Sequence, residues 1–145
     1  MIPRFGVPPD NGRSYRLRPG AYGLLMRDGR VLLTRQIASD DRQLPGGGID
    51  PGEGQLQALR REVREETGWI IGGPMRIGAY RRFAWLPDYQ FWAEKLCHVW
   101  LARPLYRRGA PIEPLHEAFW QPVERLPDAV DDLAAQAFLR AWLRR

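Results

Sequence analysis

The hydrophobic and polar positions of the chain divide it into strand-like runs and helix-like stretches. Residues 21–26 and 30–35 are apolar runs separated by Arg27-Asp28-Gly29, a turn sequence that predicts a β-hairpin. Three further strands are predicted downstream: residues 70–83, interrupted at Gly72-Gly73-Pro74, residues 96–102 and residues 117–123. Residues 1–13, rich in Pro and Gly, predict an irregular lead-in to a single domain that spans residues 1–145.

Two amphipathic helices are predicted among these strands. The first ends at Gly68, a residue suited to a left-handed C-terminal cap. Its apolar stripe, which would pack on the core, consists of Leu56, Leu59 and Val63. The second covers residues 131–143, and its predicted apolar face consists of Leu133, Ala134, Ala137, Phe138, Ala141 and Trp142. This order of strands and helices predicts an α/β (α+β) fold.

The first helix has acidic side chains along one flank. Glu62, Glu65 and Glu66 are spaced i, i+3 and i+4, so at roughly 100° per residue they share an arc of about 100°. Like charges packed this closely destabilise an isolated helix by a few tenths of a kcal/mol per pair. A hard divalent cation with oxygen ligands would compensate them. Taken alone, the run RREVREE is more typical of a solvated face with ion pairs, such as one between Arg61 and Glu65.

The residues before the helix favour the metal-site interpretation. Leu44-Pro45-Gly46-Gly47-Gly48 is a poor sequence for a regular element, and successive glycines let backbone groups approach a phosphate or a metal closely. Gly47, Glu53 and residues 61–69 (REVREETGW) together resemble the complete sequence motif of the Nudix hydrolases. Trp69 stands where that family usually has an aliphatic residue, and it keeps this position apolar.

The resemblance implies a fold, a reaction and a set of site residues. The fold is a mixed β-sheet sandwiched between the motif helix and a C-terminal helix. The reaction is hydrolysis of a pyrophosphate bond in a nucleoside diphosphate linked to another group, with Mg²⁺ or Mn²⁺ as cofactor. The implied metal ligands are Glu62, Glu65, Glu66 and the backbone carbonyl of Gly46. Glu53 would support the metal site, and Arg61 would hold the carboxylates in place.

The general base is left open by the sequence. In this family it comes from the motif helix, which makes Glu66 a candidate, or from an acid in a loop. Glu94, before the predicted fourth strand, and Glu113 and Glu117, in the Pro-rich segment before the predicted fifth, are loop candidates. A carboxylate acts as a base only within hydrogen-bond reach of the attacking water, directly or through one further water.

Substrate contacts are predicted in the loop formed by residues 83–92 (FAWLPDYQFW), where five aromatic rings surround Pro87-Asp88. Trp85 and Tyr89 flank the turn and are the rings expected to be exposed, where stacking on a base contributes about 1–3 kcal/mol. Alternatively, the rings pack beneath the loop or form the contact of a homodimer. Arg81 is the candidate for a phosphate contact; Arg82 faces the opposite side of the strand, so at most one of the two would serve.

Several substrates are compatible with the motif. Nucleoside triphosphates or their oxidised forms are favoured, because the chain lacks the additional N-terminal strands common in ADP-ribose enzymes. ADP-ribose and dinucleoside polyphosphates are alternatives, and Pro87 and Tyr89 lie slightly beyond the positions that mark those branches. RNA 5′-end processing uses the same chemistry. A nucleotide-sensing module without activity is disfavoured, because such modules commonly lose motif acids and none is lost here.

The amino-acid composition limits which binding partners and which cellular location the protein is expected to have. The formal net charge of +5 comes almost entirely from arginine, but the basic residues are scattered, which favours a small anionic substrate over nucleic acid. No apolar run approaches the roughly 18 residues that span a membrane, and the first residues lack an apolar secretory segment. Cys97 is the only cysteine and is expected to be a small buried strand residue, which predicts a cytoplasmic location without disulfides.

Overall fold

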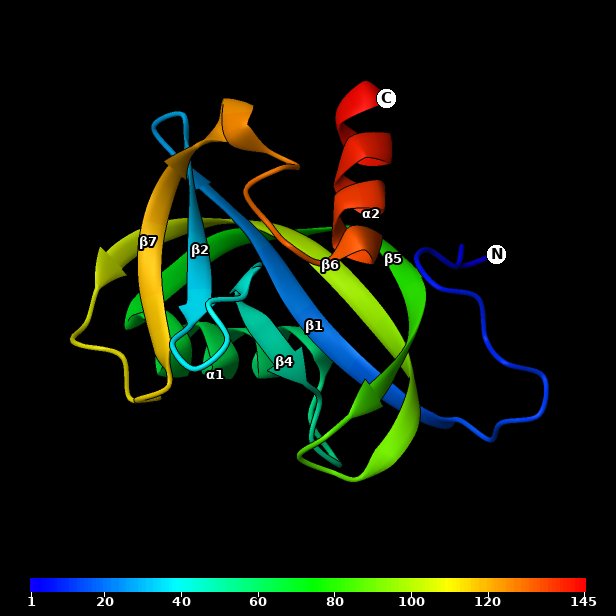
Figure 1. The fold of residues 1–145 in the computed structure, drawn as a ribbon. Coiled ribbons are helices and arrows are strands. Elements are labelled where there is room, and N and C mark those ends of the chain that lie inside the picture. Colours follow the sequence, from blue (N-terminus) through cyan, green and yellow to red (C-terminus); the bar gives the residue numbers. More distant parts are fainter.

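The computed structural model describes residues 1–145 and contains a mixed seven-stranded β-sheet with one helix on each face (Figure 1). The strands are β1 (Arg16–Arg27), β2 (Arg30–Gln36), β3 (Arg42–Gln43), β4 (Gly46–Gly48), β5 (Trp69–Leu86), β6 (Phe91–Arg107) and β7 (His116–Pro122). The helices are α1 (Gln55–Thr67) and α2 (Leu133–Arg144), and a short 3-10 helix, η1 (Val123–Arg125), follows β7. The predicted mixed sheet between two helices is therefore confirmed.

Strand β1 lies at the centre of the sheet. The strand order is β3-β2-β1-β6-β5, while β4 pairs with β1 and β7 pairs with β2. The β1–β6 pair is parallel and the other pairs are antiparallel. Because β1 also pairs with β4, the glycine-rich segment is held against the middle of the sheet.

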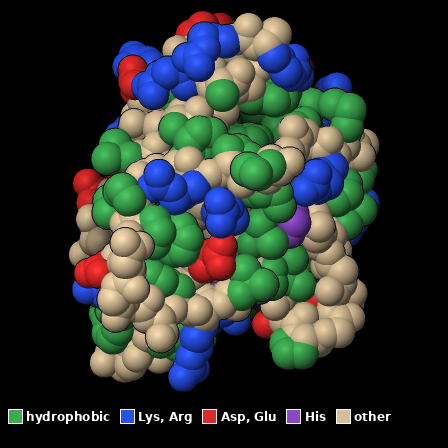
Figure 2. Space-filling model, turned by 90° about the vertical axis from the view of Figure 1, so that its right-hand side faces the viewer, with side chains coloured by type: hydrophobic (Ala, Val, Ile, Leu, Met, Phe, Trp, Pro, Cys, Tyr) green, Lys and Arg blue, Asp and Glu red, His purple; other side chains and the backbone are tan.

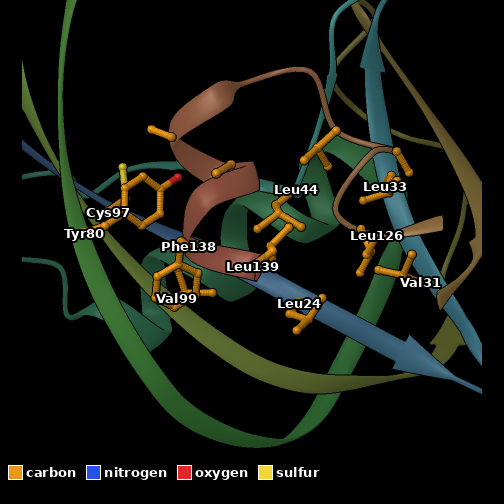
Figure 3. Packing of buried hydrophobic residues seen from close by; sticks show 14 residues of the cluster. Leu24, Val31, Leu33, Leu44, Tyr80, Cys97, Val99, Leu126, Phe138 and Leu139 are labelled. Carbon is orange, nitrogen blue, oxygen red and sulfur yellow. The ribbon is translucent and has the colours of Figure 1, made fainter. Parts of the chain in front are cut away.

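Each helix packs on its own hydrophobic cluster. Leu59 and Val63 of α1 are fully buried with Leu25 and Leu32 of the sheet. On the opposite face, Phe138 and Leu139 of α2 pack with a second cluster that includes Tyr80, Cys97 and Val99 (Figure 3). The predicted stripe of α1 and the buried position of Cys97 are confirmed.

The first hairpin forms as predicted. Asp28 and Gly29 connect β1 to β2 with φ angles of 54° and 76°, the positive values that a two-residue type I′ turn requires. Leu25 pairs with Leu32 across the hairpin. The sequence placed the start of the first strand too late, because parallel pairing with β6 extends β1 back to Arg16.

Two predictions about β5 and β6 are wrong. Residues 72–74 do not interrupt β5; the strand continues with a shift in register between Gly72 and Met75, as at a β-bulge. Residues 83–92 are not a loop, because β5 continues to Leu86 and β6 begins at Phe91, leaving only a four-residue connection. Cross-strand pairing of aromatic side chains, which stabilises a sheet, accounts for the longer strands.

The apolar face of α2 differs in part from the prediction. Leu133 is 68% exposed and Ala141 is also exposed. The buried residues of the helix are Ala134, Ala135, Phe138 and Leu139. Asp132 caps the helix by accepting a hydrogen bond from the Ala135 amide, which leaves Leu133 in the first turn on the solvent side.

The first thirteen residues are irregular, as predicted, but they contact the sheet. Arg4 forms an isolated bridge with Arg81, and the Phe5 amide donates a hydrogen bond to the Arg81 carbonyl. The Phe5 ring lies 6.2 Å from the Tyr80 ring. No helix of the chain has both the length and the apolar character needed to cross a membrane.

Candidate active site

Strand β4 brings backbone close to the acidic flank of α1. Gly46 has a φ of 147°, and a Cβ there would overlap the Ala21 carbonyl oxygen, so only glycine fits. A Cβ on Gly47 would lie 2.7 Å from the carboxyl carbon of Glu62. The glycines therefore leave room for carboxylates to lie directly against the main chain.

The Glu66 carboxylate is buried without a cationic partner. The residue is 6% exposed, and its Oε1 accepts a 3.0 Å hydrogen bond from the Gly46 amide. Burial raises the pKa of Glu66 well above its ordinary value, and the neighbouring Glu62 adds to this. Burial also raises the pKa of Glu62. The nearest basic group to Glu66 is His116, whose Nε2 lies 4.0 Å from Oε2. A buried carboxylate in this situation is costly unless a cation compensates it.

Arg61 connects the remaining acids. Its guanidinium donates to both oxygens of Glu53, at 2.7 and 2.9 Å, and to the Gly48 carbonyl at 3.1 Å. It also donates to Glu62 at 3.1 Å and to Glu65 at 3.4 Å. Hydrogen bonds from Arg61 and then from the Asp50 amide lower the pKa of Glu53 to about 2. Arg61 thus ties the helix to the glycine-rich segment, and its closest partner is Glu53.

The donors present fit a hard divalent cation. No three acidic or histidine side chains are grouped around a shared metal position, and Glu53, Glu62 and Glu65 instead accept hydrogen bonds from Arg61. However, the glycine-lined gap beside Glu62 and the uncompensated Glu66 carboxylate supply oxygen donors and negative charge in one place. Oxygen ligands of this kind suit Mg²⁺ or Mn²⁺ better than softer metals.

Glu94, Glu113 and Glu117, the three further candidates for the general base, have different surroundings in the structure. Glu94 pairs with Arg81 at 3.2 Å, and Glu117 pairs with Arg35. The amide of Glu113 donates a 2.7 Å hydrogen bond to the Glu65 carbonyl, which places Glu113 beside the end of the acidic helix. The prediction of a loop position is wrong for Glu94 and Glu117, which lie in β6 and β7 and are ion-paired. Only Glu113 lies in a loop, and it is held against the motif helix.

Sequence reasoning missed His116. Its side chain is 16% exposed, it faces Glu66, and its Nδ1 is buried without a hydrogen-bond partner. The residue begins β7, and the pairing of β7 with β2 holds it in place. Its proximity to Glu66 results from packing between distant segments, so no local sequence pattern could have indicated it.

A cavity of about 950 Å³ lies on the α2 side of the sheet. Trp85 lines this cavity, whereas Tyr89 and Arg81, the other two predicted substrate contacts, do not. Arg81 is instead held by Glu94 and the Ile2 carbonyl, and Arg82 faces the cavity. Polar and aromatic lining residues that the sequence did not single out include Tyr22, Lys95, Asp131 and Asp132. Leu44, just before the glycine-rich segment, also lines the cavity.

A family model described as the NUDIX domain matches residues 15–143. The chain belongs to the Nudix family. An RNA pyrophosphohydrolase from Halorhodospira halophila is 46% identical over 56 residues, which are 39% of this chain and 31% of that protein. A Bacillus subtilis protein provisionally named 8-oxo-dGTP diphosphatase is 36% identical over 64 residues, 43% of each chain. The Nudix chain therefore matches less than half the length of these two relatives.

Solved structures of the family extend the similarity over most of the chain. The MutT NUDIX hydrolase from Burkholderia pseudomallei has a TM-score of 0.67 and 25% sequence identity to this Nudix protein. The similarity covers 89% of this chain and 97% of that chain. Residues 47–69, identified from the sequence as the Nudix motif, lie within the matched region, so α1 is the Nudix helix.

Proposed function

We propose that this Nudix protein is a divalent-cation-dependent pyrophosphohydrolase that cleaves a nucleoside diphosphate linked to another group. One observation carries the proposal: the Glu66 carboxylate is buried against the Gly46 amide, beside Glu62 and without a cationic partner. A protein that only needed a stable helix would not require a buried carboxyl group whose ionised form has no cationic partner. The alternative of a non-catalytic nucleotide-sensing module does not explain why each motif acid is kept and positioned.

The site residues divide into metal ligands and residues that position them. Glu62, Glu65, Glu66 and the Gly46 carbonyl would hold Mg²⁺ or Mn²⁺. The bound cation would neutralise charge on the phosphates and make a water more acidic. Arg61 holds Glu62 and Glu65 through its guanidinium, and Glu53 holds Arg61 by a bidentate hydrogen bond. Loss of Arg61 would therefore disturb two proposed ligands together.

Glu113 is the proposed general base. Its Oε1 accepts a 2.9 Å hydrogen bond from the Leu115 amide, and its other oxygen has no partner in the structure. A carboxylate with one oxygen anchored and the other free can accept a proton from a nearby water. Glu66 is the remaining alternative, but its burial against Gly46 favours a role as a metal ligand.

The cavity of about 950 Å³ is the proposed nucleoside site. Ligand-binding sites typically measure about 300–1,000 Å³ and combine apolar walls with a few polar groups. Trp85 offers a ring for stacking, while the Arg82–Asp132 pair, 3.3 Å apart, offers a donor and an acceptor for the edge of a base. Nucleoside triphosphates and oxidised nucleotides fit this site, and one relative's name refers to 8-oxo-dGTP.

A product-release assay over a substrate panel tests the proposal. The panel contains nucleoside triphosphates, 8-oxo-dGTP, ADP-ribose, dinucleoside polyphosphates and capped RNA, each with Mg²⁺, Mn²⁺ or EDTA. We expect at least one compound to be cleaved with a cation and none with EDTA. Glu66→Gln should lower turnover by orders of magnitude, because it removes the charge of a proposed ligand. Glu124→Gln, an exposed acid in η1, should leave turnover unchanged. Folded protein that cleaves no compound on the panel would contradict the proposal.

A further inference from the structure

Two arginines of β1 lie over two aromatic rings at the end of the β5–β6 hairpin. The guanidinium carbon of Arg18 lies 4.8 Å from the centre of the Tyr89 ring, and that of Arg16 lies 4.7 Å from the centre of the Phe91 ring. The two rings lie 5.8 Å apart. These four residues form one continuous surface, which we call the Arg–aromatic strip.

The charge of the strip is not compensated. Neither Arg16 nor Arg18 forms an ion pair within 4.0 Å, whereas Arg81 and Arg82 in the neighbouring sheet each have an acidic partner. Arg13 stacks on Trp92 but lies 3.8 Å from Asp10, so we do not include it in the strip. Figure 2 shows arginine and lysine side chains interspersed with hydrophobic and acidic ones on the face that contains the N-terminal residues. An anionic partner with flat apolar groups complements a surface of this kind.

The strip begins at the glycine-rich segment, and its neighbour in the sheet lines the large cavity. A Cβ on Gly48 would lie 2.8 Å from Nη2 of Arg18, so this guanidinium lies against the glycine-rich segment. The carbonyl of Gly48 accepts a hydrogen bond from Arg61 on the Nudix helix. Lys95, the neighbour of Arg18 in the β1–β6 register, lines the large cavity. A chain whose end occupies the site can therefore continue along the strip.

We propose that the Arg–aromatic strip binds single-stranded RNA whose 5′ phosphates enter the acidic site, so that the substrate is the 5′ end of an RNA. The inference rests on the proposed function and specifies its substrate. Guanidinium groups pair with phosphates, and an exposed ring such as Tyr89, which is 57% exposed, can stack on a base. A mononucleotide would fill the cavity and the acidic site and would have nothing to place on the strip. One relative is itself named an RNA pyrophosphohydrolase.

The reaction on such a substrate is a hydrolysis that needs no further reactant. Water attacks the phosphorus nearest the RNA, the anhydride bond to the next phosphate breaks, and pyrophosphate leaves. The RNA keeps a 5′ monophosphate, and the proton of the attacking water passes to a carboxylate. The sequence disfavoured nucleic acid because it contains no basic run, but the fold brings dispersed arginines together with rings from a distant hairpin.

Binding of a product analogue tests the strip without turnover. The probe is a fluorescent 5′-monophosphorylated hexanucleotide RNA, and its Kd is measured by anisotropy across a range of salt concentrations. The double variant Arg16→Gln/Arg18→Gln should lower the slope of log K against log salt by about 0.7 for each lost phosphate contact. Tyr89→Ala should weaken binding by about fivefold or more. Arg103 is an exposed arginine on β6 without an ion pair, so Arg103→Gln should change neither the salt dependence nor the Kd.

Measured rates of hydrolysis then distinguish a failure of this inference from a failure of the proposed function. Wild-type kcat/KM should be higher for a 5′-triphosphorylated hexanucleotide than for ATP or GTP. The double variant should lose this advantage while its melting temperature stays unchanged, and Arg103→Gln should keep the advantage. Three outcomes would overturn the proposal that the strip binds RNA. They are an unchanged Kd in the double variant, an equal loss of RNA affinity in Arg103→Gln, and a wild-type enzyme that cleaves nucleotides without preferring RNA. A folded wild-type protein that cleaves neither substrate would overturn the proposed function itself.

Discussion

The carboxyl group of Glu62 lies in the space that a side chain on Gly47 would occupy. Gly47 needs no unusual backbone angle, unlike Gly46, so the absence of a side chain is what this position contributes. Because the atoms that a Cβ would meet form the end of a flexible side chain, the Glu62 carboxylate would move aside and the backbone would keep its path. Gly47 therefore sets the position of a proposed ligand without being essential for folding.

We predict that Gly47→Ala lowers activity much more than it lowers stability. The new methyl group should displace Glu62 from the glycine-rich segment, so cation affinity and turnover should fall by about tenfold or more. The melting temperature should change little, because the new methyl group would meet only the end of a flexible side chain. Gly109→Ala is the matched control, because a Cβ there meets nothing within 4 Å. Steady-state rates against Mg²⁺ concentration measure the effect, and full activity in Gly47→Ala would exclude a role for this contact.

Some residues of the site could be predicted from the sequence and others could not. Glu62, Glu65 and Glu66 are predictable because helical spacing alone places them on one flank. His116 is not predictable, because it reaches its place through strand pairing and the packing of distant segments, and the choice between Arg81 and Arg82 depends in the same way on which face of β5 each occupies. Spacing along one helix is a local property, whereas the position of a side chain across a sheet depends on the register of all intervening strands.

At the scale of elements, the end of α1 positions the loop that carries the proposed base. Gly68 caps the helix with a φ of 79°, and its amide donates to the Arg64 carbonyl at 2.9 Å. Its carbonyl accepts a 2.8 Å hydrogen bond from the Arg108 amide, and Glu113 donates to Glu65 in the last turn. The segment after β6 is therefore attached to the helix terminus at two points.

We predict that Gly68→Ala destabilises the fold more than Gly52→Ala does. Both residues have a positive φ, 79° and 83°, so an alanine at either position costs about 1–2 kcal/mol of conformational energy. A Cβ on Gly68 would also overlap the carbonyl oxygen of Gly109, whereas one on Gly52 would meet nothing within 4 Å. Urea unfolding should show the larger loss for Gly68→Ala, together with lower turnover as the Glu113 segment shifts. Equal losses of unfolding free energy would mean that the segment accommodates the methyl group.

The two hairpins show which elements the sequence can specify. The β1–β2 hairpin was predictable because Asp28-Gly29 meets the dihedral requirement of its turn locally. The end of the β5–β6 hairpin was predicted as a loop in which five aromatic rings surround Pro87-Asp88. The structure pairs Trp85 with Trp92, with ring centres 5.5 Å apart, and this cross-strand contact extends both strands. Such pairing depends on residues beyond the turn and escapes a local pattern.

At the scale of the whole molecule, the sheet separates two environments. The α1 side holds the buried carboxylates, and the α2 side holds the large cavity, with β1 and β4 between them. Burial raises the pKa values of Glu62 and Glu66, so without a cation the folded protein keeps protons that the unfolded chain releases above about pH 4.3. The free energy of unfolding of the metal-free protein therefore falls as the pH rises from about 4.3 through the raised pKa values of these two groups. A bound cation requires the ionised carboxylates, so its binding strengthens over the same interval.

We predict that the difference in melting temperature between Mg²⁺ and EDTA grows as pH rises from 5 to 8. At the lower pH, protons and the cation compete for Glu62 and Glu66; at the higher pH, the cation relieves repulsion that otherwise destabilises the fold, and it stabilises the native state by mass action. Differential scanning calorimetry at constant ionic strength measures the effect. Glu66→Gln removes one of the two titrating groups and should give a smaller difference with a flatter pH dependence, whereas Glu124→Gln should behave as wild type. A difference that is equal at pH 5 and pH 8, or that Glu66→Gln leaves intact, would show that the cation does not bind these carboxylates.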